Sequence, residues 1–200
     1  DDRNFPIMAM VNCCVIGLSG QSLELEMPQE SKVADLKSAI EDSWAVPQMC
    51  QKLLCGGRMV SDVCRCKALP ENELQLVVST ETLHIALQSA FAPQALEQLQ
   101  KCAKRCDQGD HAVWSAVEVE VWDCLQALPL AASEEGVANA AAAVLVAAAL
   151  AKRPKTLEEA LARLEGSSAY TAYTRLVCVK VLTAIGDSKH LYHLRGRLED

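Results

Sequence analysis

Residues 22–55 read SLELEMPQESKVADLKSAIEDSWAVPQMCQKLLC and pass from a strand pattern through a helix pattern to a second strand pattern. In residues 22–27, Leu and Met alternate with polar residues, which is typical of a half-buried strand. Val33, Leu36 and Ile40 then stand at i, i+3 and i+7, and Ser31 precedes them as an N-cap. This spacing predicts an amphipathic helix of about three turns.

Further strand patterns flank this stretch on both sides. Residues 13–17, CCVIG, precede the strand of residues 22–27 with Gly20 between them, which predicts a β-hairpin. Residues 52–55 end in Gly56-Gly57, and residues 73–78, ELQLVV, follow a turn-like Pro-Glu-Asn. The first half is therefore predicted to run strand, strand, helix, strand, strand, which indicates an α+β fold.

The order and spacing of these pieces resemble the ubiquitin family. The resemblance runs without a gap from Val15 to Asp62, includes Val46-Pro47 and the strand ending in Gly56-Gly57-Arg58, and resumes at Leu74 after a deletion of about three residues. It implies a β-grasp domain over residues 10–80. It also implies a core made of Val15, Leu23, Leu25, Met27, Val33, Leu36, Ile40, Leu53, Val60, Leu74 and Leu76.

The resemblance further implies a partner-binding patch. The exposed aliphatic positions through which ubiquitin is recognised fall on Leu18, Leu54 and Val77. One family feature is missing, because the last strand runs through Ser79-Thr80 directly into a helical pattern at Glu81 instead of ending in a flexible Arg-Gly-Gly tail. We therefore expect an integral binding module that is not conjugated to other proteins.

The second half shows helix patterns only. They cover about residues 82–90, 93–106, 111–128, 134–152, 156–164 and 168–185, with a seventh at 188–198. Residues 138–151 are apolar all round, which indicates a central buried helix. Residues 175–198 weakly resemble one HEAT or armadillo repeat, so a HEAT-like array is the first interpretation and an irregular bundle the second. The predicted domains are an extension (1–9), a ubiquitin-like domain (10–80) and a helical domain (81–200).

Composition narrows the class of protein. Half of the 200 residues are apolar and the net charge is −7, so no basic field is available for nucleic acid. The ten cysteines are too sparse for a disulfide-stapled secreted domain, and no signal peptide is visible, which favours a reducing compartment. The chain begins without Met, so we expect a soluble or peripheral intracellular protein, cytoplasmic or organellar after removal of a targeting segment. The longest charge-free stretch in the second half, 136–151, is too short to span a bilayer.

No pattern of residues indicates a catalytic, cofactor or metal site. Cys50, Cys55, Cys64 and Cys66 lack the paired C-x2-C spacing of zinc sites. Cys102 and Cys106 share a helix face beside basic residues, but are expected mainly to fill space in the core. The four histidines are scattered, and Gly56-Gly57 is not followed by Lys-Ser or Lys-Thr, so it is a turn and not a phosphate-binding loop.

These observations favour a non-catalytic adaptor with protein partners and without nucleic acid, cofactor or transmembrane span. The alternative is a structural accessory subunit of a large complex, for example an organellar, photosynthetic or respiratory one. A third hypothesis is an enzyme that acts on ubiquitin-type bonds, which would need a reactive cysteine within reach of a histidine.

Overall fold

A computed structural model of the chain describes residues 9–17, 19–128, 135–151, 154–165 and 172–185. Contacts divide the chain into two units, which are Asp1–Ser43 with Gln48–Ser79, and Trp44–Pro47 with Thr80–Asp200. We call them the sheet unit and the helical unit. Within the described ranges, none of the helices has both the length and the apolar character that crossing a membrane requires.

The sheet unit is built on five strands in the spatial order β2-β1-β5-β3-β4. β1 and β5 pair in parallel, whereas the other neighbours pair antiparallel. The predicted α+β fold class is confirmed, since a mixed sheet is followed by helices, and this order fits a β-grasp-like domain followed by a helical domain. The bounds are β1 Met10–Ile16, β2 Ser22–Pro28, α1 Val33–Trp44, η1 Gln48–Cys50, β3 Gln51–Cys55, β4 Arg58–Met59, η2 Cys66–Ala68 and β5 Glu73–Val78.

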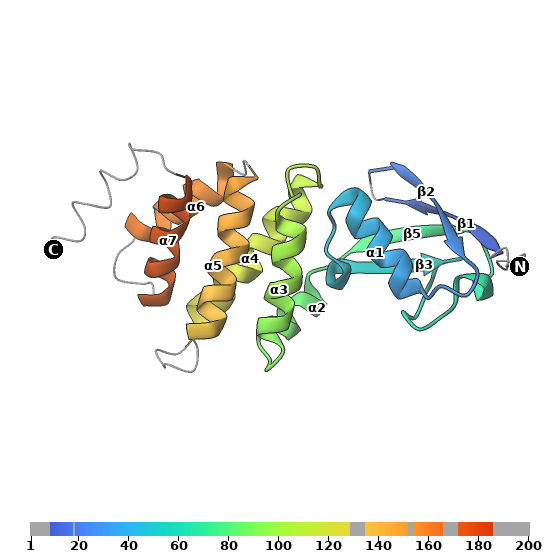
Figure 1. Cartoon of the computed structure of the whole chain (residues 1–200), viewed down its shortest axis with the longest axis horizontal. Helices are drawn as coiled ribbons and strands as arrows, with labels where there is room; N and C mark the ends of the chain where they lie inside the picture. The colour runs from blue at the N-terminus through green and yellow to red at the C-terminus, as the bar shows by residue number, and fades with distance from the viewer. Residues whose placement is uncertain (1–8, 18, 129–134, 152–153, 166–171, 186–200) are drawn as a thin grey trace, which may run out of the picture. The chain divides into compact units, whose positions relative to one another are not determined.

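The core of the sheet unit lies between α1 and one face of the sheet (Figure 1). The Gln51 side chain on β3 donates a hydrogen bond to the Lys37 carbonyl of α1 at 3.0 Å, which ties the helix to the sheet. Most of the expected core positions are buried, whereas Leu23, Leu25 and Val60 are half-buried. The buried ones are Val15, Met27, Val33, Leu36, Ile40, Leu53, Leu74 and Leu76.

A tight turn sets the register of the last hairpin. Gly56 and Gly57 both have positive φ values, 55° and 75°, which glycine adopts without a steric penalty. Two such residues between paired strands make the turn type that matches the twist of a hairpin. The turn places Cys55 opposite Arg58 and Leu54 opposite Met59.

The helical unit holds six helices in the described ranges, close to the predicted bounds. They are α2 Glu81–Leu87, α3 Ala92–Ala103, α4 His111–Ala127, α5 Glu135–Leu150, α6 Pro154–Glu165 and α7 Ala172–Ile185. The predicted helix at 188–198 lies outside the described residues. Helices adjacent in the chain pack as pairs, α2 with α3, α4 with α5 and α6 with α7. Neighbouring pairs contact each other through several helices, and α3 and α7 both pack against α5, so α3, α5 and α7 lie side by side (Figure 1).

Helix α5 is central, as predicted, because it contacts α3, α4, α6 and α7. Its buried side includes Val144 and Leu145. The prediction of a buried helix fails for one stripe, in which Asn139 and Leu150 are exposed and Ala143 and Ala147 are half-buried. An apolar sequence fixes what a helix can bury, but the neighbours decide which side is covered.

The start of α6 differs from the sequence pattern. A capping box of Thr156 with Glu159 is suggested by their spacing. The helix instead begins at Pro154, because proline suits the first turn, where its missing N–H has no helical partner. Thr156 therefore lies inside the helix, is fully buried, and donates a hydrogen bond to Glu118 Oε1 of α4 at 2.9 Å.

Candidate interaction surfaces

The face of the sheet opposite α1 carries a row of three aliphatic residues and one glutamine. Ile16, Gln75, Leu54 and Met59 stand directly beside one another on β1, β5, β3 and β4, as the strand register requires. Their neighbours along the strands, such as Val15, point the other way into the core, because side chains alternate along a strand. Neighbouring strands lie about 4.8 Å apart, so this row spans roughly 15 Å.

The predicted patch residues belong to this face as far as the structure describes them. Leu54 and Val77 are half-buried and lie diagonally on β3 and β5, since Leu54 pairs with Gln75 and Val77 pairs with Lys52. Leu18, the third predicted residue, lies outside the described residues. We call Ile16, Leu54, Met59 and Val77 the sheet-face cluster.

Two members of the sheet-face cluster, Met59 and Ile16, were not predicted from the sequence. Met59 is 70% exposed although it is large and apolar, and the glycine turn places it beside Leu54. Ile16 is half-buried and reaches the row through the parallel pairing of β1 with β5. Alternation along residues 13–16 was a signal that Ile16 faces away from Val15, but the pairing of the strands cannot be read from one strand alone.

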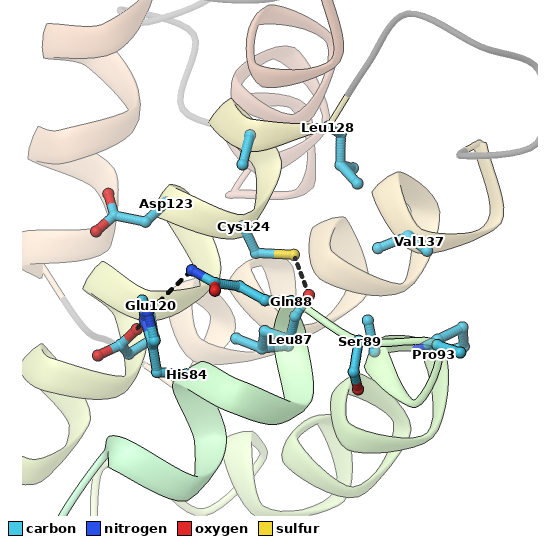
Figure 2. Close-up of a pocket in the computed structure, with 13 residues that line it drawn as sticks. His84, Leu87, Gln88, Ser89, Pro93, Glu120, Asp123, Cys124, Leu128 and Val137 are labelled. Atoms are coloured by element: carbon cyan, nitrogen blue, oxygen red, sulfur yellow. Dashed lines mark hydrogen bonds and ion pairs between the residues drawn. The ribbon is translucent and has the colours of Figure 1, made fainter.

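The helical unit contains a hollow with a volume of about 550 Å³ between α2, α4 and the starts of α3 and α5. Leu87, Cys124 and Val137 contribute apolar walls, while Glu120 and Asp123 bring carboxylates (Figure 2). His84 also lines it. Its Nδ1 lies 2.8 Å from Glu120 Oε2, and its Nε2 lies 2.9 Å from Gln88 Nε2.

The two ring nitrogens of His84 are already occupied by hydrogen bonds within the protein. If Nδ1–H donates to the Glu120 carboxylate, the lone pair of Nε2 accepts from the Gln88 amide, so both ring nitrogens are engaged. The Cys124 thiol donates to the Leu87 carbonyl at 3.6 Å. The hollow thus offers two carboxylates over apolar walls, while the ring nitrogens of its histidine are already hydrogen-bonded.

Cys102 in α3 and Cys106 in the turn after it are packing residues, since the helix ends at Ala103, before the predicted end at residue 106. Cys102 and Cys106 are both fully buried, and Cys106 Sγ lies 4.0 Å from the Ala148 carbonyl oxygen of α5. Their basic sequence neighbours are instead on the outside of the helix, where Lys101 pairs with Glu97 and Lys104 is exposed. The interpretation of Cys102 and Cys106 as small apolar filling is confirmed by this burial.

Burial also perturbs the thiols of Cys13, Cys66 and Cys178. It raises the pKa of Cys178 to about 12 and that of Cys13 to about 11, with a smaller contribution to Cys13 from the nearby Cys66. The pKa of Cys66 is raised for the same main reason. A thiol with a raised pKa is a poor nucleophile, since the thiolate is the reactive form. Within the described part of the chain, His, Cys, Asp and Glu form no group of three that could hold a metal ion.

Comparisons with known proteins add little to this geometry. No protein-family model matches the sequence, and no curated protein matches it. Among solved structures, the chain is similar to one described as the crystal structure of ATBAG1 in complex with HSP70, at 11% identity over 88% of this chain and 94% of that chain. The TM-score is 0.34, and a value this low carries no argument about fold or function.

Proposed function

We propose that the protein is a non-catalytic adaptor that binds other proteins, with an integral ubiquitin-like domain in its sheet unit and a HEAT-like helical array as its second unit. The observation that carries this proposal is the sheet-face cluster. Met59 is mostly exposed, and Leu54 and Val77 are only half-buried, although all three belong to a small unit with a complete core on the other face of its sheet.

An exposed aliphatic cluster of this kind lowers the solubility of a protein unless a partner covers it. Its members differ from isolated surface leucines because the strand register holds Ile16, Leu54 and Met59 in one row with Gln75 and places Val77 diagonally beside Leu54. Lys52 and Gln75 lie on the same face and supply polar groups, which is the composition of an interface with an apolar centre and a polar rim. The surface is therefore suited to docking a protein.

Chain connectivity supports the integral character of the domain. β5 ends at Val78 and α2 begins at Glu81, so the end of the sheet unit continues into a helix. A carboxylate for attachment to another protein is not present at this point in the chain. The sheet unit thus acts, in this proposal, as a docking module that remains joined to the helical unit.

The test replaces Leu54 by Arg in the full chain. Arginine at the centre of the row places a charge where a partner would bury apolar surface, so the tagged variant should lose the proteins that co-purify with the native chain from its own cell extract. The thermal midpoint should stay nearly unchanged, since Leu54 lies on the face of the sheet opposite the core.

A matched control is available in the same unit. Val63 is 74% exposed and lies outside the strands, so Val63→Arg adds the same charge away from the sheet-face cluster. It should retain the partners that Leu54→Arg loses. If both variants retain the same partners, the sheet-face cluster is not the docking surface and the proposal fails.

A further inference from the structure

A second surface of the helical unit has the shape and charge of a binding groove. It is an open, mostly apolar groove of about 610 Å³ that follows the uncovered stripe of α5 and is flanked by α3 and α7. Ala143, Val146 and Ala147 form its half-buried floor, and Leu150 stands at one end with 59% of its surface exposed. We call it the α5 groove.

The two sides of the α5 groove are basic. Lys104, directly after the end of α3, lines one side and Lys180 of α7 lines the other, and both are exposed. The Lys180 ammonium donates to Asn139 Oδ1 of α5 at 2.6 Å, which holds it over the groove. Among the described residues that line the groove, none is Asp or Glu, although the whole chain carries a net charge of −7. A local positive rim in an acidic protein favours a negatively charged ligand.

Small side chains make the floor suitable for a helix. Alanines allow another backbone to approach closely, and the stripe from Asn139 to Leu150 is about 17 Å long at 1.5 Å per residue. That length matches about three turns of helix. An extended peptide would instead need partners for its backbone N–H and C=O groups, which a floor of Ala and Val side chains does not provide.

We propose that the α5 groove binds an amphipathic α-helix of a protein partner, with Ala- or Leu-type residues on its buried face and Asp or Glu on both flanks. The aliphatic face packs against the floor, and the acidic flanks meet Lys104 on one side and Lys180 on the other. This is the helix-in-groove mode of recognition. The groove proposal gives the chemistry of a second partner for the adaptor. It rests on the proposed adaptor function only in treating the bound helix as part of a partner protein.

The test measures binding of a defined peptide to the full chain by fluorescence anisotropy. The probe is a fluorescein-labelled helical peptide of about 14 residues, with Leu on one face and Glu elsewhere, and its dissociation constant should be on the order of 10–100 μM. A second peptide carries Lys in place of every Glu, and a third carries a central Pro. Both should bind about tenfold more weakly, because one reverses the charge and the other breaks the helix.

Matched protein variants distinguish binding in the groove from a general effect of the protein's net charge on the peptide. Lys104→Glu with Lys180→Glu reverses both rim charges and should weaken binding of the Glu peptide about tenfold. Lys101→Glu with Arg175→Glu changes the net charge equally on the same two helices, at exposed positions that do not line the groove, and should leave binding within about twofold. Equal effects of the two double variants, or equal affinity for all three peptides, would overturn the proposal.

Two further outcomes are distinguishable. If sedimentation velocity shows a dimer that the rim variant dissociates and the control variant does not, the groove binds a second copy of this chain and the proposal of a foreign helix is wrong. Leu54→Arg should bind the Glu peptide like the native chain, because Leu54 belongs to the sheet unit. A failure at the groove therefore leaves the sheet-face test standing, and the reverse also holds.

Discussion

The buried hydrogen bond from Thr156 to Glu118 links α6 to α4 inside the helical unit. Thr156 is fully buried and Glu118 is 4% exposed, so the carboxylate depends on protein donors in place of water. We predict that Thr156→Val destabilises the helical unit although it removes only one hydroxyl group.

The size of the effect follows from the groups involved. Valine has nearly the shape of threonine, so the substitution leaves no cavity, and the loss is that of one hydrogen bond to a charged acceptor. Such bonds contribute about 1.5–3 kcal/mol, which gives a loss of about 2 kcal/mol in the free energy of unfolding. With an m-value of about 1.5 kcal/mol/M, the urea midpoint should fall by about 1.3 M.

Tryptophan fluorescence can follow this unit selectively. The chain has three tryptophans: Trp114 and Trp122 lie in α4, whereas Trp44 is the last residue of α1, so a Trp44→Phe background leaves only the signals of α4. Equilibrium urea unfolding at pH 7 therefore reports on the helices. A double-mutant cycle with Glu118→Gln isolates the pair, since the neutral amide should make Thr156→Val less costly by about 1 kcal/mol.

Thr183 provides the control. Its hydroxyl donates to the Val179 carbonyl of its own helix at an exposed site, so Thr183→Val should change the free energy of unfolding by less than about 0.5 kcal/mol. The reasoning is refuted if Thr156→Val and Thr183→Val shift the urea midpoint equally.

Two further predictions concern stability. Asp110 caps α4 by accepting a hydrogen bond from the Ala112 N–H at 2.7 Å, so Asp110→Ala should cost about 1 kcal/mol in urea unfolding while Asp110→Asn, which can still cap, should cost less; equal losses would contradict the cap. The buried Cys178 has a pKa of about 12 when folded against 9.0 ordinarily, so it keeps its proton while the unfolded chain ionises, and stability should fall as the pH rises from about 9 toward 12. Cys178→Ala should flatten that decline relative to the native chain, and parallel curves of urea midpoint against pH would argue against it.

Local sequence patterns were sufficient to predict most of the secondary structure. Alternation over residues 22–27 and the spacing of Val33, Leu36 and Ile40 predicted β2 and α1 because each side chain has one solvent side and one core side. β4 could not be predicted, since two residues are too few to show alternation and the strand exists through its pairing across the Gly56-Gly57 turn.

The surfaces depended on contacts that no local pattern contains. Leu54 and Val77 were placed by resemblance to a family, but Met59 joins them only through the strand register. Lys104 directly follows α3 and Lys180 lies in α7, far apart in sequence, and no local pattern relates the two residues. They flank one groove because α3 and α7 both pack against α5, which is a property of the tertiary arrangement.

The edges of the sheet determine how the sheet unit can meet other chains. β2 forms one edge and carries the exposed Glu24 and Glu26 before ending at Pro28, while the opposite edge, β4, has only two residues. A foreign strand added beside β2 would meet carboxylates and then a proline that cannot donate, and β4 is too short to template pairing. Edge-to-edge polymerisation is thereby opposed, even though the face of the sheet opposite α1 carries the sheet-face cluster.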